Sequence, residues 1–388
     1  MRSNYFSAIP VVAALVMTLS ANAEETSAAR PMHWYRGNTH THTRFSDKSD
    51  ANGPPAAVVE WYKAHGYQFL FVTDHEHLTD VASLNERYGE RDKFLVLPGQ
   101  EITQIIADPN HTGGVRHAHV NGLDINRTIM PLLPPERSDV TGIMRLAATG
   151  VSMTATYQRN LTEIVKAGGF PQINHPNLLW SVELKDLMPL QAPFLFEIWN
   201  GYPNSNNLGG TDEQGHVSPS AESLWDSLLG AHKVVWGVGS DDSHTYDQFD
   251  NPQSPSPGKA WVEVCAPALT IADVMNALRH GNFYASTGVR LLSYKATSKE
   301  ISIEFERLPD WSPNLIPVTR YTTRFIGSGG RVLAEIAGPS PHYSFQGNEG
   351  YVRASITDSD GRRAWTQPVF LDARRDESQL RAQCVNNN

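Results

Sequence analysis

The sequence predicts an α/β fold with a mainly parallel sheet, followed by a smaller all-β part. Up to about residue 288, short apolar runs alternate with helix-like segments, which is the pattern of a parallel sheet, open or closed into a barrel. From about Val289, apolar and polar residues alternate with a period of two, which is typical of half-buried strands. A chain of 388 residues is long enough for one large domain or two of ordinary size.

The first 23 residues read as an export signal and not as part of the fold. Arg2 gives a weakly positive start, residues 8–19 are almost continuously apolar, and residues 21–23 (Ala-Asn-Ala) have the small-x-small pattern cut by signal peptidase. We therefore expect cleavage after Ala23 and a periplasmic or secreted protein. A retained membrane anchor is the alternative, but about twelve apolar residues are short for a bilayer, so no stable membrane insertion is expected.

The elements of the first part can be placed by their residues. A helix is expected to begin after Pro54 and Pro55, because proline suits a helix start but not its interior, and to end at Gly66. Buried strands are expected over the apolar runs 68–74, 94–102, 170–176, 194–200, 234–242 and 260–266. Helices are expected over 161–167, 221–229 and 271–279.

The second part, residues 289–373, is expected to be all β. Its segments are rich in Thr, Tyr, Val and Ile, and Asp360-Gly361 has the residues of a hairpin turn. About 85 residues of this kind suggest a small sandwich-like domain. Residues 374–388 are interpreted as a polar tail.

Charge and cysteine content argue against a nucleic-acid-binding protein and against a small fold held together by disulfides. The formal net charge is −9, whereas nucleic-acid binding depends on a basic surface, so no nucleic-acid partner is expected. The two cysteines, Cys265 and Cys384, are far apart, and Cys384 falls in the polar tail. They form neither a disulfide framework nor a metal-binding spacing, so the fold is expected to rest on its core. Any metal site must therefore use His, Asp and Glu.

His and carboxylate residues follow the ends of several expected strands. His40 and His42 are two residues apart, so both imidazoles point to the same side of an extended chain. The C-terminal strand ends of a parallel α/β barrel form one face, where active sites are built. Convergence there would create a site for several ions of zinc, manganese or iron. Besides His40 and His42, the candidate ligands are Asp47, His75, Glu101, His119, His175, Asp242 and His244.

Three positions leave an alternative open. His117 could take the place of His119, because the His-Ala-His pair has the spacing of the first motif. Asp241 could take the place of Asp242, although only Asp242 gives the Asp-x-His spacing. Asp74 could orient a ligating imidazole instead of binding metal itself. The histidines expected to be solvated are His33, His65, His216, His232, His280 and His342, whereas His77 and His111 lie close to proposed ligands.

These motifs resemble those of the polymerase and histidinol phosphatase family, known as PHP. The matching pieces are NTHTHT with a following SD, TDH, the QE after a short strand, an isolated strand-end His, and D-S-H. The resemblance covers His33 to about Gly288 and implies a distorted seven-stranded (β/α) barrel, similar to a TIM barrel, with up to three metal ions. HWYRGNTHTHT, WYKAHGY and FYASTG are similar to an exported branch that includes carbamate-hydrolysing members, in which a β-domain follows the barrel.

The resemblance also implies which residues hold each ion. The first ion would be bound by His40, His42, Glu101 and Asp242, and the second by Glu101, as a bridge, with His119 and His175. The third would be bound by Asp47, His75 and His244. Many family members have His where this chain has Asp47, so a centre with two ions is left open beside one with three.

Two ions that share Glu101 can also share a water. Their combined charge lowers the pKa of that water towards neutrality, and they polarise the group that it attacks. No catalytic residue is assigned beyond this metal-bound water. Phosphoester hydrolysis is the commonest activity in the family, so a phosphoesterase acting on a small-molecule ester is expected. A carbamate, carboxylic ester or amide hydrolase is the alternative, and a third hypothesis is a non-catalytic protein whose β part binds glycan or a partner.

Cations near the cluster would favour a phosphate substrate, because Arg and Lys bind phosphate through charged hydrogen bonds. The candidates are Arg44, Arg116, Arg159 and Lys259. An apolar pocket would instead be lined by aromatic residues. The aromatic residues near the expected mouth, which could equally belong to the core, are Tyr157, Trp180, Trp199, Tyr202 and Tyr246.

Overall fold

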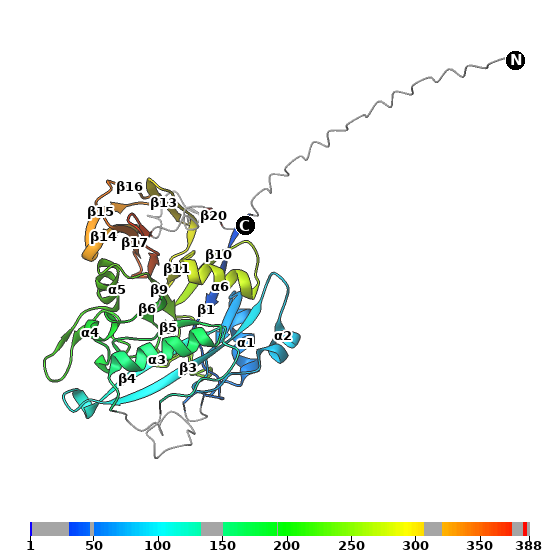
Figure 1. Cartoon of the computed structure of the whole chain (residues 1–388), viewed down its shortest axis with the longest axis vertical. Helices are drawn as coiled ribbons and strands as arrows, with labels where there is room; N and C mark the ends of the chain where they lie inside the picture. Colours follow the sequence, from blue (N-terminus) through cyan, green and yellow to red (C-terminus); the bar gives the residue numbers. More distant parts are fainter. Residues whose placement is uncertain are drawn as a thin grey trace. The chain divides into compact units, whose positions relative to one another are not determined.

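The structure, a computed structural model, describes residues 31–46, 50–132, 150–191, 193–305, 320–374 and 383–385, together with Met1 (Figure 1). Residues 31–388 cluster as one compact unit, and Met1–Arg30 as another. The expected signal peptide lies outside the described residues except for Met1, so its cleavage after Ala23 stays a prediction. In the described part of the chain, every helix is too short or too polar to span a bilayer.

The first part of the chain is a mixed α/β structure, which confirms the expected class. Its strands pair in the order β1 (Met32–Asn38), β2 (Phe69–Val72), β3 (Leu95–Ala107), β4 (Val115–Leu123), β5 (Phe170–Ile173), β6 (Phe194–Asn200) and β9 (Val235–Ser240). The expected apolar runs are therefore strands. A separate small hairpin consists of β7 (Gly210–Thr211) and β8 (Val217–Ser218).

The expectation of a parallel sheet is wrong for β4. This strand runs antiparallel to both β3 and β5, whereas the other pairs from β1 to β9 are parallel. The reason is the connection, because residues 108–114 are too few for a parallel crossover, which takes about a dozen residues or more. Gly113 and Gly114 have φ angles of 81° and 74° in this turn, where another residue would be strained.

The chain segments that follow β1 and β9 meet each other. Thr41 and Ser243 form an isolated parallel bridge, in which His42 N donates to Ser243 O at 3.0 Å. Asp242 N donates to His40 O, also at 3.0 Å. Between the described residues of these two segments the pairing is limited to this bridge, so closure into the seven-stranded barrel stays a prediction. The bridge nevertheless places two segments with expected metal ligands side by side.

Helices pack against these strands. The helices are α1 (Pro55–Ala64), α2 (Val81–Tyr88), α3 (Met153–Lys166), α4 (Leu184–Leu187), α5 (Ala221–Gly230) and α6 (Ile271–His280), and short 3-10 turns lie at Thr112–Gly114, Leu178–Trp180 and Ser328–Gly330. The expected starts of α1, α5 and α6 are confirmed. The sequence pattern does not predict α2, whose residues are all at least partly exposed.

The helix α3 begins earlier than expected. Ser152 caps it by accepting a hydrogen bond from Ala155 N, which fixes the start of the helix. Its buried face includes the polar Thr156 and Asn160, so the apolar periodicity is interrupted in its first half. The helix packs on β4 and β5, and Figure 1 shows it lying along this part of the sheet.

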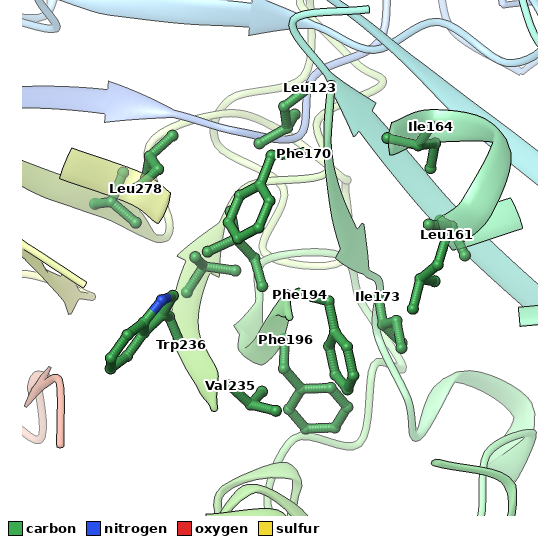
Figure 2. Packing of buried hydrophobic residues seen from close by; sticks show 14 of the residues in the cluster. Leu123, Leu161, Ile164, Phe170, Ile173, Phe194, Phe196, Val235, Trp236 and Leu278 are labelled. Carbon is green, nitrogen blue, oxygen red and sulfur yellow. The ribbon is translucent and has the colours of Figure 1, made fainter. Parts of the chain in front are cut away.

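Continuous apolar runs form the interior of the first part. Figure 2 shows Leu161 of α3 beside Ile173 of β5, with Phe194 and Phe196 of β6 next to them. Every residue of β9 is buried, and all but one of β6. Strands covered on both faces need apolar side chains at nearly every position, which explains the runs. Fully burying one such side chain contributes about 1.5–3 kcal/mol.

The C-terminal part is β structure, as expected, but it continues the sheet of the first part. From β1 the sheet runs through β10 (Trp261–Ala266), β11 (Phe283–Ser286), β18 (Arg363–Thr366), β17 (Tyr351–Asp358), β14 (Tyr321–Gly327) and β15 (Arg331–Ala337), with β19 (Val369–Phe370) beside β17. In the other direction β1 is followed by β20 (Gln383–Val385), β12 (Leu291–Ala296), β13 (Glu300–Phe305) and β16 (His342–Ser344). These strands and those of the first part thus share one sheet.

The two ends of this sheet enclose a second core. Phe305 of β13 stacks on Tyr321 of β14 with 4.1 Å between ring centroids, and Phe325 of β14 stacks on Tyr343 of β16 at 5.5 Å. This packing is sandwich-like, although both layers belong to a single sheet. The expected hairpin at Asp360-Gly361 is present between β17 and β18, where Gly361 has a φ angle of 82°.

The two cysteines, from which no disulfide was expected, are joined to each other. Cys265 of β10 and Cys384 of β20 form a disulfide with a Cα–Cα distance of 5.9 Å. The polar tail therefore contains a strand, and Cys384 in it is fully buried. The flanking residues are polar, so the sequence pattern hides this strand. It pairs with β1 on one side and β12 on the other, which brings Cys384 to β10 across 119 residues of sequence.

A buried ion pair connects the C-terminal strands to the helix α5. Arg353 of β17 is fully buried, and its Nε and Nη2 donate to the two carboxylate oxygens of Asp226 at 2.8 and 2.7 Å. Its Nη1 donates to Glu222 at 2.9 Å, and Tyr351 OH donates to Asp226 at 2.8 Å. Such a pair persists only when each buried charge is compensated, as it is here.

Candidate metal centre

The structure brings the expected ligands together in three groups of His, Asp and Glu side chains. Within each group the ligand atoms lie within 4.8 Å of one another. The groups are His40, His42, Glu101 and Asp242; Glu101, His119 and His175; and His42, Asp50, His75 and His244. Asp47, the remaining expected ligand, lies outside the described residues.

The first group has the membership that the resemblance implies for the first ion. His40 Nε2 lies 3.2 Å from Glu101 Oε2 and 3.1 Å from Asp242 Oδ1. His42 Nε2 lies at the same two distances from the same two atoms, 3.2 and 3.1 Å. All four side chains are buried. The two imidazoles therefore point at one pair of carboxylates, as the spacing of His40 and His42 predicts.

The second group shares Glu101 with the first. Its other oxygen, Oε1, lies 3.1 Å from His119 Nδ1 and 3.4 Å from His175 Nε2. The two oxygens of one carboxylate thus face different groups. Asn174 Nδ2 donates to Oε1 at 2.8 Å and helps to hold this orientation.

The third group contains the expected His75 and His244, together with Asp50 and His42, which were not expected in it. Asp50 Oδ2 lies 3.2 Å from His244 Nε2 and 3.6 Å from His75 Nε2, and His42 completes the group. Asp50 is not among the ligands expected from the sequence. The signal was present, because Ser49-Asp50 repeats the Ser46-Asp47 pair three residues later and stands closer to the helix start.

The alternatives at two other positions have a structural answer. His119 belongs to the second group, whereas His117 is in none of the groups formed by described residues. Asp242 belongs to the first group, whereas Asp241 points to the opposite side, where its carboxylate accepts hydrogen bonds from Tyr62 OH and from the backbone N–H groups of residues 258–260. Asp241 thus anchors the loop that leads into β10.

Two of the grouped residues have strained backbones. Asp242 has a φ angle of 50° and His175 one of 21°, in a region that residues other than glycine rarely adopt. Each follows the end of a buried strand, β9 and β5, and turns its side chain back toward the other groups. Strain of this kind persists only where the surroundings hold it, and it is common at functional sites.

Hydrogen bonds fix which imidazole nitrogen faces each group. His244 Nδ1 donates to the carbonyl of Asp242 at 2.8 Å, which leaves Nε2 for Asp50. His42 Nδ1 lies 2.8 Å from Ser46 Oγ, and Ser46 Oγ donates to Asp74 Oδ1 at 3.0 Å. Asp74 therefore orients His42 through Ser46, in the positioning role considered for it. A metal-ligating histidine usually donates the N–H of its other ring nitrogen to an acceptor in this way.

Burial and neighbouring charges shift the pKa values in the centre strongly. Burial lowers the pKa of His40, but the carboxylates of Asp242 and Glu101 outweigh it and hold that pKa well above its usual value. Burial opposes ionisation of Glu101 and Asp242 as well, yet the surrounding histidines, His40 first, hold both of these pKa values well below the usual range. For His75, burial dominates and lowers the pKa. The carboxylates are thus ionised and ready to bind cations.

The unpaired atoms of the centre fit divalent metal ions. Buried polar atoms normally have a hydrogen-bond partner. Among the described residues, the buried atoms that lack a hydrogen bond of good geometry include His42 Nε2, His119 Nε2, Asp50 Oδ2 and Asp242 Oδ1. All four belong to residues of the three groups. A set of imidazole nitrogens and carboxylate oxygens suits zinc, manganese or iron.

The cations expected near the substrate have mostly other partners. Arg116 is buried, with its Nε donating to Ser181 O at 2.7 Å and its guanidinium paired with Asp186. Arg159 Nη1 donates to Met130 O at 2.7 Å, and Lys259 Nζ to Ser254 O at 2.5 Å. Arg44 is exposed in the segment between His42 and Asp50.

Of the aromatic residues considered for a substrate pocket, one borders the centre and the others pack elsewhere. The Tyr202 ring lies 5.3 Å from the His244 ring, edge to face, and so borders the third group. Tyr157 is buried in the main core, and Trp199 packs against Trp365 at 5.7 Å. Tyr246 OH lies 2.5 Å from Ser243 Oγ, behind the loop that bears Asp242. Trp180 packs close to Gly210.

The histidines expected to be solvated are mostly so. His65, His216, His232 and His342 are exposed, and His33 and His280 are half-buried. None of these histidines belongs to a group formed by described residues, and the same holds for His77 and His111.

Comparison with known proteins gives a distant likeness. No family model matches the chain, and no curated protein matches it. The chain is similar to a solved two-domain protein from Bacteroides vulgatus that contains a predicted PHP-like metal-dependent phosphoesterase. The two share 14% sequence identity, the likeness covers 84% of this chain and 90% of the other, and the TM-score is 0.44. The chemistry of the centre is therefore inferred from its own side chains.

Proposed function

We propose that this chain is an exported metal-dependent hydrolase of the PHP type, built on a distorted (β/α) barrel. The observation that carries the proposal is the position of Glu101. Its Oε2 lies 3.2 Å from the Nε2 atoms of His40 and His42, and its Oε1 lies 3.1 Å from His119 Nδ1. A carboxylate placed in this way can bind two ions at once. Bound zinc, manganese or iron ions would lower the pKa of a water and polarise the bond that it attacks.

The residues of the chain supply binding and orientation. His40, His42, Glu101 and Asp242 would hold the first ion, and Glu101, His119 and His175 the second. A third ion would be held by Asp50, His75 and His244, with Asp50 in the place first assigned to Asp47, because the lone pair of His42 Nε2 serves the first ion and His42 Nδ1 faces Ser46. Burial of these side chains keeps the surrounding dielectric low, so their charges interact with bound cations more strongly than in water.

The leading substrate is a small phosphate ester, and the alternative is a carbamate, carboxylic ester or amide. Arg44 supports the first, because it is an exposed cation two residues after His42, and arginine binds phosphate oxygens. The hydrogen bonds that engage Arg116, Arg159 and Lys259 elsewhere support the second, since they remove three of the expected phosphate-binding cations.

Metal content and a substrate panel test the proposal. Purified protein should contain two to three equivalents of transition metal, measured by elemental analysis. Nitrophenyl phosphate monoesters, phosphodiesters, carbamates and carboxylic esters are then compared by kcat/KM. Asp242→Ala should abolish turnover of every accepted substrate, whereas His216→Ala, an exposed histidine outside the three groups, should leave it unchanged. Arg44→Ala should reduce turnover of phosphate esters selectively.

Two results would count against the proposal. Less than one equivalent of metal after growth in metal-supplemented medium would exclude the centre. Wild-type turnover by Asp242→Ala would assign the measured activity to another site. A kcat/KM that is higher for carbamates or carboxylic esters, with Arg44→Ala silent, would replace the phosphoesterase by the alternative.

A further inference from the structure

Glu197 is a fully buried carboxylate that belongs to none of the three ligand groups. It lies in β6, with 0% of its surface exposed. Its Oε1 lies 2.7 Å from His40 Nδ1. The same oxygen accepts hydrogen bonds from Gln172 Nε2 at 3.1 Å and from Ser240 Oγ. One oxygen of this carboxylate thus contacts side chains that come from the segment after β1, from β5 and from β9.

The other oxygen of Glu197 holds a second part of the centre. Its Oε2 accepts a hydrogen bond from the backbone N–H of His175 at 2.6 Å. It also accepts one from Asn200 Nδ2 at 2.8 Å, and the same amide lies 3.3 Å from Asp242 Oδ2. Glu197 therefore contacts His40 directly, fixes the strained backbone at His175 and reaches Asp242 through Asn200.

We propose that Glu197 is a positioning residue that sets the metal affinity of the first two ligand groups without contacting the ions. It holds His40 with Nδ1–H turned to the carboxylate, so that the lone pair of Nε2 is available to an ion that Glu101 and Asp242 would also bind. It also holds the backbone from which the His175 side chain enters the second group. This role rests on the proposed function, since it presupposes that the groups bind metal.

A carboxylate is the side chain that this position requires. Every group that contacts the Glu197 carboxylate is a hydrogen-bond donor, provided that the His40 ring carries a proton on Nδ1. An ionised carboxylate only accepts, so it can serve all of them, whereas a glutamine of nearly equal shape would present two N–H donors on one side. Those donors would face either His40 and Ser240 or His175 and Asn200. One half of the network would then be broken, and the imidazole would be free to rotate or to change tautomer.

The experiment compares Glu197→Gln with wild type and with Glu349→Gln in the full-length protein. Glu349 is a matched control, because it is also a fully buried carboxylate that accepts backbone hydrogen bonds, from Gln346 N and Gly347 N, far from the centre in sequence and structure. Metal-free protein is titrated with Zn²⁺, and separately with Mn²⁺, against a chromophoric chelator. Loss of such a supporting partner lowers metal affinity about 10- to 100-fold, and we expect this for Glu197→Gln alone.

A second measurement separates positioning from a general loss of structure. The Zn²⁺-loaded proteins are labelled with ¹⁵N-histidine, and the N–H signal of His40 Nδ1 is followed by NMR. This signal should be shifted downfield by its carboxylate partner in wild type and Glu349→Gln, and it should move or disappear in Glu197→Gln. The melting temperature of the metal-free proteins is recorded beside it. A purely structural role would lower that temperature and leave both the affinity and the His40 signal of the folded protein unchanged, which would overturn the proposal.

Ser240→Ala provides the test if Glu197→Gln does not fold. Ser240 Oγ donates only to Glu197 Oε1, so its removal loosens the partner of His40 with a small change in volume. We expect a loss of Zn²⁺ affinity near the lower end, about tenfold, with the fold retained. Unchanged affinity in a folded Ser240→Ala protein would overturn the role of Glu197. Failure of the wild-type protein to take up Zn²⁺ or Mn²⁺ at all would instead overturn the proposed function.

Discussion

The metal-free centre holds a proton where a metal ion is expected. His42 Nε2 lies 3.2 Å from Glu101 Oε2 and 3.1 Å from Asp242 Oδ1, so a proton on Nε2 is shared between two carboxylates. Burial lowers the pKa of His42, but the hydrogen bonds to Asp242 and Glu101 outweigh it and raise that pKa to about 10. A metal ion that binds Nε2 must displace this proton. Metal affinity should therefore depend on pH well above the usual range of histidine.

The size of this effect follows from the pKa. One pKa unit corresponds to about 1.4 kcal/mol, so removing a proton with a pKa of about 10 at pH 7 costs about 4 kcal/mol. Between pH 6.5 and pH 8.5 the affinity should rise about tenfold per pH unit for each proton displaced. The raised pKa values of His40 and His175, where carboxylates likewise outweigh burial, should make the slope steeper.

The stability of the metal-free protein should change in the opposite direction. A pKa of His42 raised to about 10 contributes stability that is fully present below the unfolded pKa of 6.5 and is lost as the pH rises through about 10. The melting temperature of the metal-free protein should therefore fall above pH 6.5. The increase that Zn²⁺ gives should grow over the same range, since binding stabilises the native state.

Calorimetry provides the assay. Zn²⁺ is titrated at pH 6.5, 7.5 and 8.5 in pairs of buffers with different ionisation enthalpies, so that the protons released per ion are counted directly. His216→Ala serves as the control, because His216 is exposed and belongs to none of the ligand groups. We expect at least one proton released per ion at pH 7.5. Zn²⁺ binding without proton release, and with an affinity independent of pH, would refute the assignment of His42 as a ligand of the first ion.

Three further results are expected. Asp50→Asn should lower the metal content by one equivalent in elemental analysis and Asp47→Asn should not, and the reverse result would restore the first assignment of the third group. Arg353→Met leaves Asp226 buried without its partner and should cost about 3–5 kcal/mol of unfolding free energy in urea; an unchanged midpoint would contradict the buried pair. Cys384→Ser removes a disulfide that links two residues 119 positions apart. The chain entropy of the unfolded state alone predicts a loss of about 5 kcal/mol of stability. A melting temperature equal to that of the wild type would show that the disulfide does not form.

The sequence predicts the strands well where burial on both faces dictates their composition. The run 194–200 coincides with β6 and the run 234–242 contains β9, because strands covered by helices on one side and by the interior on the other leave little room for polar residues. Strand direction is decided elsewhere. The direction of β4 depends on the length of residues 108–114, and the position of Cys384 depends on neighbours far away in sequence. The periodicity of apolar residues indicates neither the direction of a strand nor its neighbours far away in sequence.

The members of the three groups could largely be predicted because their positions are set locally. His40 and His42 share a face through the two-residue repeat of an extended chain, and Asp242 and His175 follow directly on buried strands. The carboxylate of the third group lies in a loop without periodicity. There the sequence offers two Ser-Asp pairs, Ser46-Asp47 and Ser49-Asp50, and the contact of Asp50 with His244 could be found only in the structure.

The partners of charged residues could not be found in the same way. Arg116 stands beside an expected ligand, His119, and a cation there suggests a substrate contact, yet it is paired with Asp186, 70 residues further along the chain. Glu197 lies inside an apolar run, where a buried charge is rare and already calls for a partner, but only the fold shows that the partner is His40. The candidate ligands can therefore be recognised from sequence motifs, whereas the residues that hold them in position can be recognised only from the fold. Substitutions at Glu197 can change metal affinity while every ligand of the centre stays in place.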